Sequence, residues 1–139
     1  MKLFLDTSAF AKRYVAEQGS EDVLALCQKA DSLVVSVVCL PELISTLCRL
    51  VREKKLARAA YLDLKANAIA DLADVDVCQI TPGVLASVVS LLETQPLRAM
   101  DALHLACALA VAPDIFVSAD QRQLAAARRA GLKIADVSA

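Results

Sequence analysis

Short apolar segments alternate with longer helical segments along the whole chain, and this alternation limits the fold more than any other feature. The segments with strand character are brief and show little period-two patterning, as strands covered on both faces do. They are Lys2–Leu5, Leu33–Val38, Val75–Ile80, Ile115–Ser118 and Lys133–Ala135. The sequence therefore predicts an α/β fold, a parallel sheet with right-handed crossovers that place helices on both of its faces.

The segments between these strands have the length and composition of helices. The expected helices are Thr7–Ala16, Ser20–Ala30, Pro41–Glu53, Leu56–Leu72, Pro82–Leu92, Arg98–Val111 and Asp120–Ala130. Pro41 suits the first turn of a helix, Pro113 ends the helix before the fourth strand, and Gly131 suits a C-terminal cap. The chain has 139 residues and no repeat or linker-like stretch, so we expect a single domain spanning residues 1–139.

The apolar content is high, with 58% hydrophobic residues and a mean hydropathy of +0.53, but it does not indicate a membrane protein. The longest uncharged stretch, 77–92, contains Pro82 and Gly83 and is shorter than the roughly 18 apolar residues of a membrane span. Asp6 comes too early for the apolar region of a signal peptide. The five cysteines form no Cys-x-x-Cys pair, which is typical of reduced core residues. We therefore expect a cytoplasmic protein that has no contact with a membrane.

The charge of the chain says little about its partner. The formal net charge is −1, so no overall positive field attracts nucleic acid. The basic residues do cluster, but any single cluster is explained by a solvated helix face. These residues are Lys12 and Arg13, then Arg49, Arg52, Lys54, Lys55 and Arg58, then Arg122, Arg128 and Arg129. Charge alone does not indicate an RNA-binding protein.

Several acidic residues follow the predicted strands rather than precede them. Asp6 comes directly after the first strand, Glu42 shortly after the second, and Asp120 two residues after Ser118. Because the carboxyl ends of parallel strands share one edge of the sheet, where ligands bind in open α/β folds, we expect these side chains to converge. Asp136 belongs at the margin of the same edge. The acids that precede strands belong at the opposite edge; they are Asp31, Asp74 and Asp114.

Taken singly, Asp6 and Asp120 are explained as helix N-caps and Glu42 as a first-turn acid. Asp101 is harder to explain in this way, because its helix is apolar nearly all round and is therefore expected to be buried. A buried carboxylate without a partner is costly. Arg98, three residues earlier, is one candidate partner. A divalent cation shared with the other acids is the better explanation.

Crowding of the acids supports a metal site. Two carboxylates about 4 Å apart repel by roughly 4 kcal/mol at an effective dielectric constant near 20, so several stay ionised together only beside a cation. Oxygen ligands without a His or Cys cluster favour Mg²⁺ or Mn²⁺ over zinc. His104 is the single histidine of the chain, and we expect it in the core or at the rim rather than as a ligand.

Four short acidic motifs together resemble those of PIN domains. They are Leu5-Asp6-Thr7-Ser8-Ala9-Phe10, Pro41-Glu42-Leu43, Met100-Asp101-Ala102-Leu103-His104 and Ser118-Ala119-Asp120. Each motif alone is weak, but the four stand in the right order over nearly the whole chain. The stretch Lys12…Tyr14…Glu17-Gln18-Gly19-Ser20-Glu21 and the ending Ala127…Gly131-Leu132 are similar to the VapC toxins of toxin–antitoxin pairs.

This resemblance implies a PIN-like three-layer sandwich, with a five-stranded parallel sheet flanked by helices. It also implies a Mg²⁺- or Mn²⁺-dependent endoribonuclease that cuts single-stranded RNA, forms a homodimer and is held inactive by a cognate VapB-like antitoxin. The catalytic acids would be Asp6, Glu42, Asp101 and Asp120. Asp6, Asp101 and Asp120 would hold the metal, and Glu42 would bind it or orient the attacking water. The hydroxyls expected to contact the water or the phosphate are those of Thr7, Ser8 and Ser118.

Other classes of protein place acids at the ends of strands. A non-catalytic RNA-binding or scaffold module of the same fold would need the basic clusters but not all four acids. A phosphatase would require Asp-x-Asp after the first strand, where residue 8 is Ser, and a receiver domain would require a Lys where Ala119 and Asp120 follow Ser118. The complete set of acids favours the nuclease.

The first helices carry a candidate partner surface. Phe10 and Tyr14 are four residues apart and share one face of a helix, beside Val15, Lys12 and Arg13. Two interpretations stay open: this face meets the C-terminal segment of an antitoxin, or it packs on the sheet.

Overall fold

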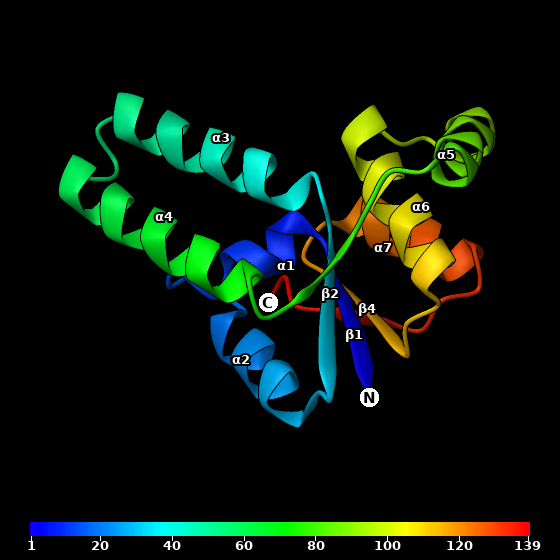
Figure 1. Cartoon of the computed structure of the whole chain (residues 1–139), viewed down its shortest axis with the longest axis horizontal. Helices are drawn as coiled ribbons and strands as arrows, with labels where there is room; N and C mark the ends of the chain where they lie inside the picture. The colour runs from blue at the N-terminus through cyan, green and yellow to red at the C-terminus, as the bar shows by residue number, and fades with distance from the viewer.

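The computed structural model describes residues 1–139 and contains five strands and seven helices (Figure 1). The strands are β1 (Lys2–Leu5), β2 (Ser32–Ser36), β3 (Asp76–Cys78), β4 (Ile115–Ser118) and β5 (Ile134–Asp136). The helices are α1 (Thr7–Ala11), α2 (Ser20–Lys29), α3 (Cys39–Arg52), α4 (Arg58–Leu72), α5 (Pro82–Thr94), α6 (Ala99–Val111) and α7 (Gln121–Arg129). None of these helices has the length and apolar content required to cross a membrane.

All strand pairs in the sheet are parallel, in the order β3-β2-β1-β4-β5, which confirms the predicted fold class. The chain starts at the central strand β1, adds β2 and β3 on one side, and then crosses over to add β4 and β5 on the other side. The order therefore reverses between β1 and β4. In open α/β sheets, ligands bind outside the carboxyl ends of the strands at such a reversal.

The sheet separates two hydrophobic cores, with α1–α4 on one side and α5–α7 on the other (Figure 1). Successive residues of β1 point to opposite faces, so Leu3 and Leu5 enter the first core and Phe4 enters the second. Phe4 stacks on Phe116 of β4 with ring centroids 5.7 Å apart. Burial on both faces explains why the strands lack alternating polar residues.

The first helix is shorter than the sequence predicted, because the chain turns after Ala11 instead of continuing to Ala16. Lys12 closes this turn: its Nζ donates to the carbonyl of Gln18 at 2.5 Å and lies 3.3 Å from Oε1 of Glu17. Lys12 is consequently buried rather than part of a solvated face.

Phe10 is fully buried in the first core, so of the two interpretations of the Phe10 and Tyr14 face, packing in the core holds for Phe10 and contact with a partner does not. Tyr14 is half-buried, and its hydroxyl donates to Asp71 of α4 at 2.6 Å. The reason is the early end of α1, after which the chain folds back onto the sheet and α4.

The C-terminal segment packs on the start of α2. Gly19 has a φ of +90°, and a Cβ at this position would lie 1.8 Å from the carbonyl oxygen of Val137. The amide of Val137 in turn donates to the carbonyl of Ser118 at 3.0 Å. The glycine thus allows the chain end to lie close to the carboxyl edge of the sheet.

Candidate functional site

Four elements bring the four predicted acids to one pocket at the carboxyl edge of the sheet. Asp6 follows β1, Glu42 and Asp101 lie in the first turns of α3 and α6, and Asp120 is the N-cap of α7. Two adjoining cavities of about 350 and 590 Å³ share Glu42, Asp101 and Asp120 in their lining, and the smaller cavity also includes Asp6. Asp136 lies on the edge strand β5, at the margin of this edge as expected.

Asp6 is almost completely buried, with 3% of its surface exposed, and is held by three hydrogen bonds. Its Oδ1 accepts from the amide of Ala9 at 3.0 Å, as an N-cap does, and from the Ser8 hydroxyl at 2.6 Å. Its Oδ2 accepts from the Ser118 hydroxyl at 2.5 Å. Burial nevertheless raises the pKa of Asp6, because desolvation of the charged form outweighs these bonds. Capping and metal binding are compatible roles for this carboxylate.

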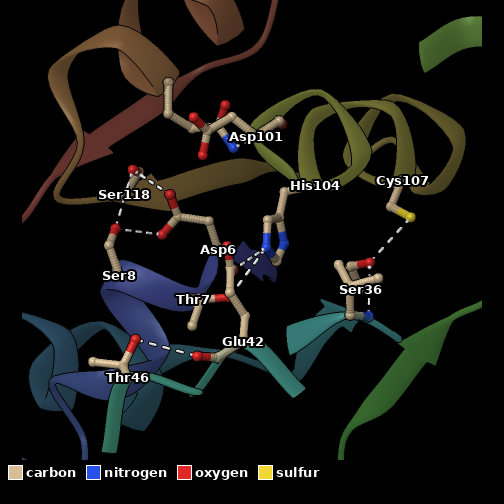
Figure 2. A network of polar contacts seen from close by, with 12 residues as sticks. Asp6, Thr7, Ser8, Ser36, Glu42, Thr46, Asp101, His104, Cys107 and Ser118 are labelled. Atoms are coloured by element: carbon tan, nitrogen blue, oxygen red, sulfur yellow. Dashed lines mark hydrogen bonds and ion pairs between the residues drawn. The ribbon is translucent and has the colours of Figure 1, made fainter. Parts of the chain in front are cut away.

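Of the two carboxylate oxygens of Glu42, Oε1 accepts two hydrogen bonds and Oε2 has no protein partner. Its Oε1 accepts hydrogen bonds from the hydroxyl of Thr7 and from Nε2 of His104, the latter at 2.7 Å (Figure 2). Desolvation would raise the pKa of Glu42, but the bonds from His104 and Thr7 outweigh it and hold the pKa below its usual value. Glu42 is therefore ionised at neutral pH.

His104 is buried, with 1% of its surface exposed, one turn after Asp101 on α6. Because an ionised Glu42 oxygen can only accept, Nε2 carries the proton, and the Thr7 oxygen lies 3.0 Å from the same nitrogen. Nδ1 is buried without a hydrogen-bond partner, which fits an unprotonated ring nitrogen better than an N–H group. The expectation of a core histidine is confirmed, but its contact with Glu42 was not foreseen.

Asp101 is the least constrained of the four acids. No hydrogen bond engages its carboxylate, and it lies across the pocket from Asp6 on the helix that carries His104 (Figure 2). Partial burial, followed by repulsion from Asp120, Glu42 and Asp6, raises the pKa of Asp101. Asp120, Glu42 and Asp6 therefore lie close enough to Asp101 to disfavour its charge.

Asp101 has no cationic partner within the chain. Arg98 lines the same cavity but forms no ion pair with it. The carboxylate is also only half-buried, which is less than the apolar helix had suggested. Asp120 caps α7 through Oδ1, which accepts from the amides of Arg122 and Gln123 at 2.9 and 3.1 Å. Its Oδ2 accepts no bond from the protein.

The three predicted hydroxyls bond to acids of the pocket. Ser8 and Ser118 both donate to Asp6, and Thr7 donates to Glu42. The Ser8 oxygen also accepts from the amide of Ala119 at 2.9 Å, which ties the end of β4 to the start of α1. In this arrangement the hydroxyls orient the carboxylates, and Thr7 and Ser8 also line the smaller cavity.

Sequence reasoning missed Gln123, which is fully buried between α6 and α7. Its Nε2 donates to the carbonyl of Asp101 at 3.1 Å, whereas its Oε1 is buried without a partner. This one bond joins the first turn of the Asp101 helix to the helix capped by Asp120. The only signal in the sequence is a polar residue on the apolar face of α7, which alone does not identify a role.

The donor set of the pocket fits a hard divalent cation. All its charged donors are carboxylates, as Mg²⁺ and Mn²⁺ prefer, and their mutual repulsion would be relieved by such an ion. No group of three or more acidic, His or Cys side chains is arranged so that it could hold a metal ion by itself. This is compatible with Mg²⁺, which usually keeps several waters and takes one or two carboxylates from the protein.

Comparison with known protein families supplies the deciding observation. Residues 3–130 match the PIN domain, a range that includes all four acids. The chain belongs to the PIN-domain family. Within it, the PIN domain described here is 30% identical to the ribonuclease VapC45 of Mycobacterium tuberculosis over 135 residues, which covers 96% of this chain and 94% of the relative. The similarity to VapC toxins inferred from the motifs is thereby confirmed.

Solved structures agree with this PIN fold at low sequence identity. M. tuberculosis VapC20, described as a sarcin–ricin loop cleaving toxin, superposes with a TM-score of 0.70 at 18% identity, covering 94% of this chain and 95% of that chain. A toxin–antitoxin complex from Klebsiella pneumoniae gives a TM-score of 0.67 at 13% identity, covering 97% of both chains. These likenesses confirm the predicted three-layer PIN architecture.

Proposed function

We propose that this PIN domain is a Mg²⁺- or Mn²⁺-dependent endoribonuclease that cuts single-stranded RNA and serves as the toxin of a toxin–antitoxin pair. The whole chain, residues 1–139, would act as one domain. The observation that carries the proposal is the single pocket lined by Asp6, Glu42, Asp101 and Asp120. The similarity of the chain to a VapC ribonuclease, which extends over 96% of its length, supports the same activity.

Each acid has a proposed role that follows from its surroundings. Asp6, Asp101 and Asp120 would hold the metal ion, one or two of them directly and the rest through its bound waters, because they flank the pocket and Asp101 and Asp120 keep oxygens without protein partners. When bound, the ion supplies a water of lowered pKa and neutralises charge that develops on the phosphate. Glu42 would bind the ion or orient the attacking water through Oε2, since Oε1 is occupied by Thr7 and His104.

The remaining residues would position these acids. Ser8 and Ser118 hold both oxygens of Asp6, and Thr7 with His104 fixes the rotamer and the ionised state of Glu42. Such prepared carboxylates need little rearrangement when the substrate binds, which lowers the cost of reaching the transition state. A direct contact of Thr7, Ser8 or Ser118 with the water or the phosphate remains the less supported alternative.

The proposed partners are the RNA substrate, a VapB-like antitoxin and a second copy of the chain in a homodimer. The complexes among the structural neighbours support the antitoxin. The antitoxin would pack on exposed apolar residues of α2 and α4, which are Leu24, Leu62 and Ile69. Five free cysteines fit the reducing cytoplasm as the compartment.

RNA cleavage by the purified protein tests this function. We expect single-stranded RNA to be cut with Mg²⁺ or Mn²⁺ and left intact with EDTA. Asp6→Asn and Asp101→Asn should lose most of the activity while keeping the fold. Asp63→Asn is the matched control, because Asp63 is exposed on α4 outside the pocket. Cleavage in EDTA, or full activity in either pocket variant, would overturn the assignment.

A further inference from the structure

Two arginines line the larger cavity together with the acids. Arg98 is the N-cap of α6 and Arg122 is the second residue of α7, and both line the cavity of about 590 Å³ that Glu42, Asp101 and Asp120 also line. Both side chains are exposed. Neither guanidinium takes part in an ion pair or a side-chain hydrogen bond, although carboxylates line the same space.

The position of these arginines is unfavourable for helix stability. The N-terminus of a helix carries a partial positive charge, so a cation there is slightly destabilising, whereas the same cation in the last turn is stabilising. Four other arginines lie in the last turns of helices, Arg128 and Arg129 in α7 and Arg49 and Arg52 in α3, whereas Arg58 begins α4. Arg98 and Arg122 therefore contribute neither a favourable dipole interaction nor an ion pair to the fold.

Charge complementarity indicates what the arginines bind. The acids repel a polyanion, and a cation held among them would attract a single phosphate at that point. A neighbouring phosphate of the same strand needs its own cationic partner. Guanidinium groups form two parallel N–H···O bonds with the non-bridging oxygens of a phosphate, and they stay charged at every relevant pH.

We propose that Arg98 and Arg122 form a subsite for an RNA backbone phosphate adjacent to the phosphate that is cut. The subsite holds the strand in register with the acids and is independent of base identity, because phosphate contacts carry no sequence information. This inference rests on the proposed ribonuclease function. It extends that function by assigning residues outside the acidic motifs to substrate binding.

Binding without cleavage tests the subsite directly. The probe is a fluorescent single-stranded RNA oligonucleotide that contains a cleavage position, titrated in EDTA with protein carrying Asp6→Asn so that cleavage is suppressed. We expect Arg98→Ala and Arg122→Ala each to raise the Kd about tenfold, as the loss of a charge-assisted bond does. Arg98→Lys should recover part of the affinity. Each Ala variant should also lower the slope of log Kd against log salt concentration by roughly 0.7.

Arg128→Ala is the matched control, since Arg128 is an exposed arginine at the other end of α7 with no side-chain partner. It should leave the Kd within about twofold of the parent. Melting temperatures distinguish binding from folding: removing Arg98 or Arg122 should leave the melting temperature unchanged or slightly higher, because a cation leaves a helix N-terminus.

A phosphate scan locates the contact on the strand. Methylphosphonate linkages, which lack the charge, are introduced one at a time into the oligonucleotide. A methylphosphonate at one linkage next to the cleavage position should weaken binding to the parent protein, which carries only Asp6→Asn, about as much as Arg98→Ala weakens binding to unmodified RNA. The same linkage should cause no further loss of affinity in the Arg98→Ala variant. The subsite is wrong if both arginine variants bind like Arg128→Ala, or if every linkage weakens parent and variant equally. A wild-type protein that binds RNA through the arginines but never cuts it would refute the nuclease and leave the subsite standing.

Discussion

Replacing Asp101 with Asn should stabilise the metal-free protein, which is the reverse of what the loss of a stabilising contact does. The carboxylate makes no hydrogen bond, and its neighbours Asp120, Glu42 and Asp6 raise its pKa by repulsion after the contribution of burial. The amide keeps the shape of the side chain and removes the charge. In metal-free buffer at neutral pH, the substitution therefore removes repulsion without creating a cavity.

The size of the effect follows from Coulomb's law. Two carboxylates about 4 Å apart repel by roughly 1 kcal/mol in water and roughly 4 kcal/mol at a dielectric constant near 20. Asp101 is half-buried, so we expect a net gain of about 1–2 kcal/mol. For a domain of 139 residues, this raises the melting temperature by roughly 3–8 °C.

The pH dependence has a defined sign. Between the ordinary pKa of 3.8 and its raised value, the folded protein keeps on Asp101 a proton that the unfolded chain releases. Stability contributed by this group is therefore lost as pH rises through that window, and it returns as pH falls. The contribution of Asp101 to the melting temperature of the metal-free wild type should therefore increase as pH is lowered from neutral through this window. Asp101→Asn should flatten this trend.

Thermal unfolding in EDTA and in Mg²⁺ measures both effects. Mg²⁺ at about 100 times its Kd should stabilise the wild type by roughly 2.7 kcal/mol, and Asp101→Asn should lose most of this response. Asp63→Asn, an exposed acid of α4, should behave like wild type in both buffers. A lower melting temperature for Asp101→Asn in EDTA would refute the argument from repulsion, and so would an undiminished response to Mg²⁺.

Two further predictions concern the histidine that holds Glu42 and the glycine that packs against the C-terminal segment. His104→Ala should raise the pKa of Glu42, because the bond from Nε2 would no longer offset the effect of burial. The acid limb of the pH–rate profile of cleavage should then move to higher pH, and an unchanged profile would contradict this role of His104. Gly19→Ala should destabilise the protein by more than about 2 kcal/mol in denaturant unfolding, since its Cβ would meet Val137. The control Gly131→Ala should lower the free energy of unfolding by only about 1 kcal/mol, because Gly131 shares the positive φ but has open space around it. Equal losses of stability at the two glycines would refute the clash with Val137.

The parts of the fold that local patterns specify were predictable. Strands β1 and β4 begin and end where the apolar runs do, and chain direction in a parallel sheet then sorts the acids between its two edges. Asp31 and Asp114, placed at the opposite edge, indeed lie at the start of β1: Asp31 accepts from the N-terminal amine of Met1, and Asp114 accepts from the amide of Lys2. The convergence of the pocket acids follows from the same rule.

The features that the sequence did not reveal depend on contacts that helix and strand patterns do not encode. The end of α1 is set by Lys12 turning back to Gln18, which a helical pattern does not show. The contact between His104 and Glu42 spans 62 positions along the chain, so no local spacing encodes it. Whether Phe10 packs on the sheet or meets a partner stayed open in the sequence for the same reason, because its burial depends on contacts with residues distant in the chain.

Anomalous diffraction from crystals grown with Mn²⁺ tests the central claim most directly. We predict a peak in the pocket within about 2.0–2.2 Å of oxygens from Asp101 and at least one of Asp6 and Asp120. Crystals of Asp101→Asn grown in the same way should show a much weaker peak. The absence of a peak in wild-type crystals at millimolar Mn²⁺, or a peak held only by residues outside this pocket, would contradict the account.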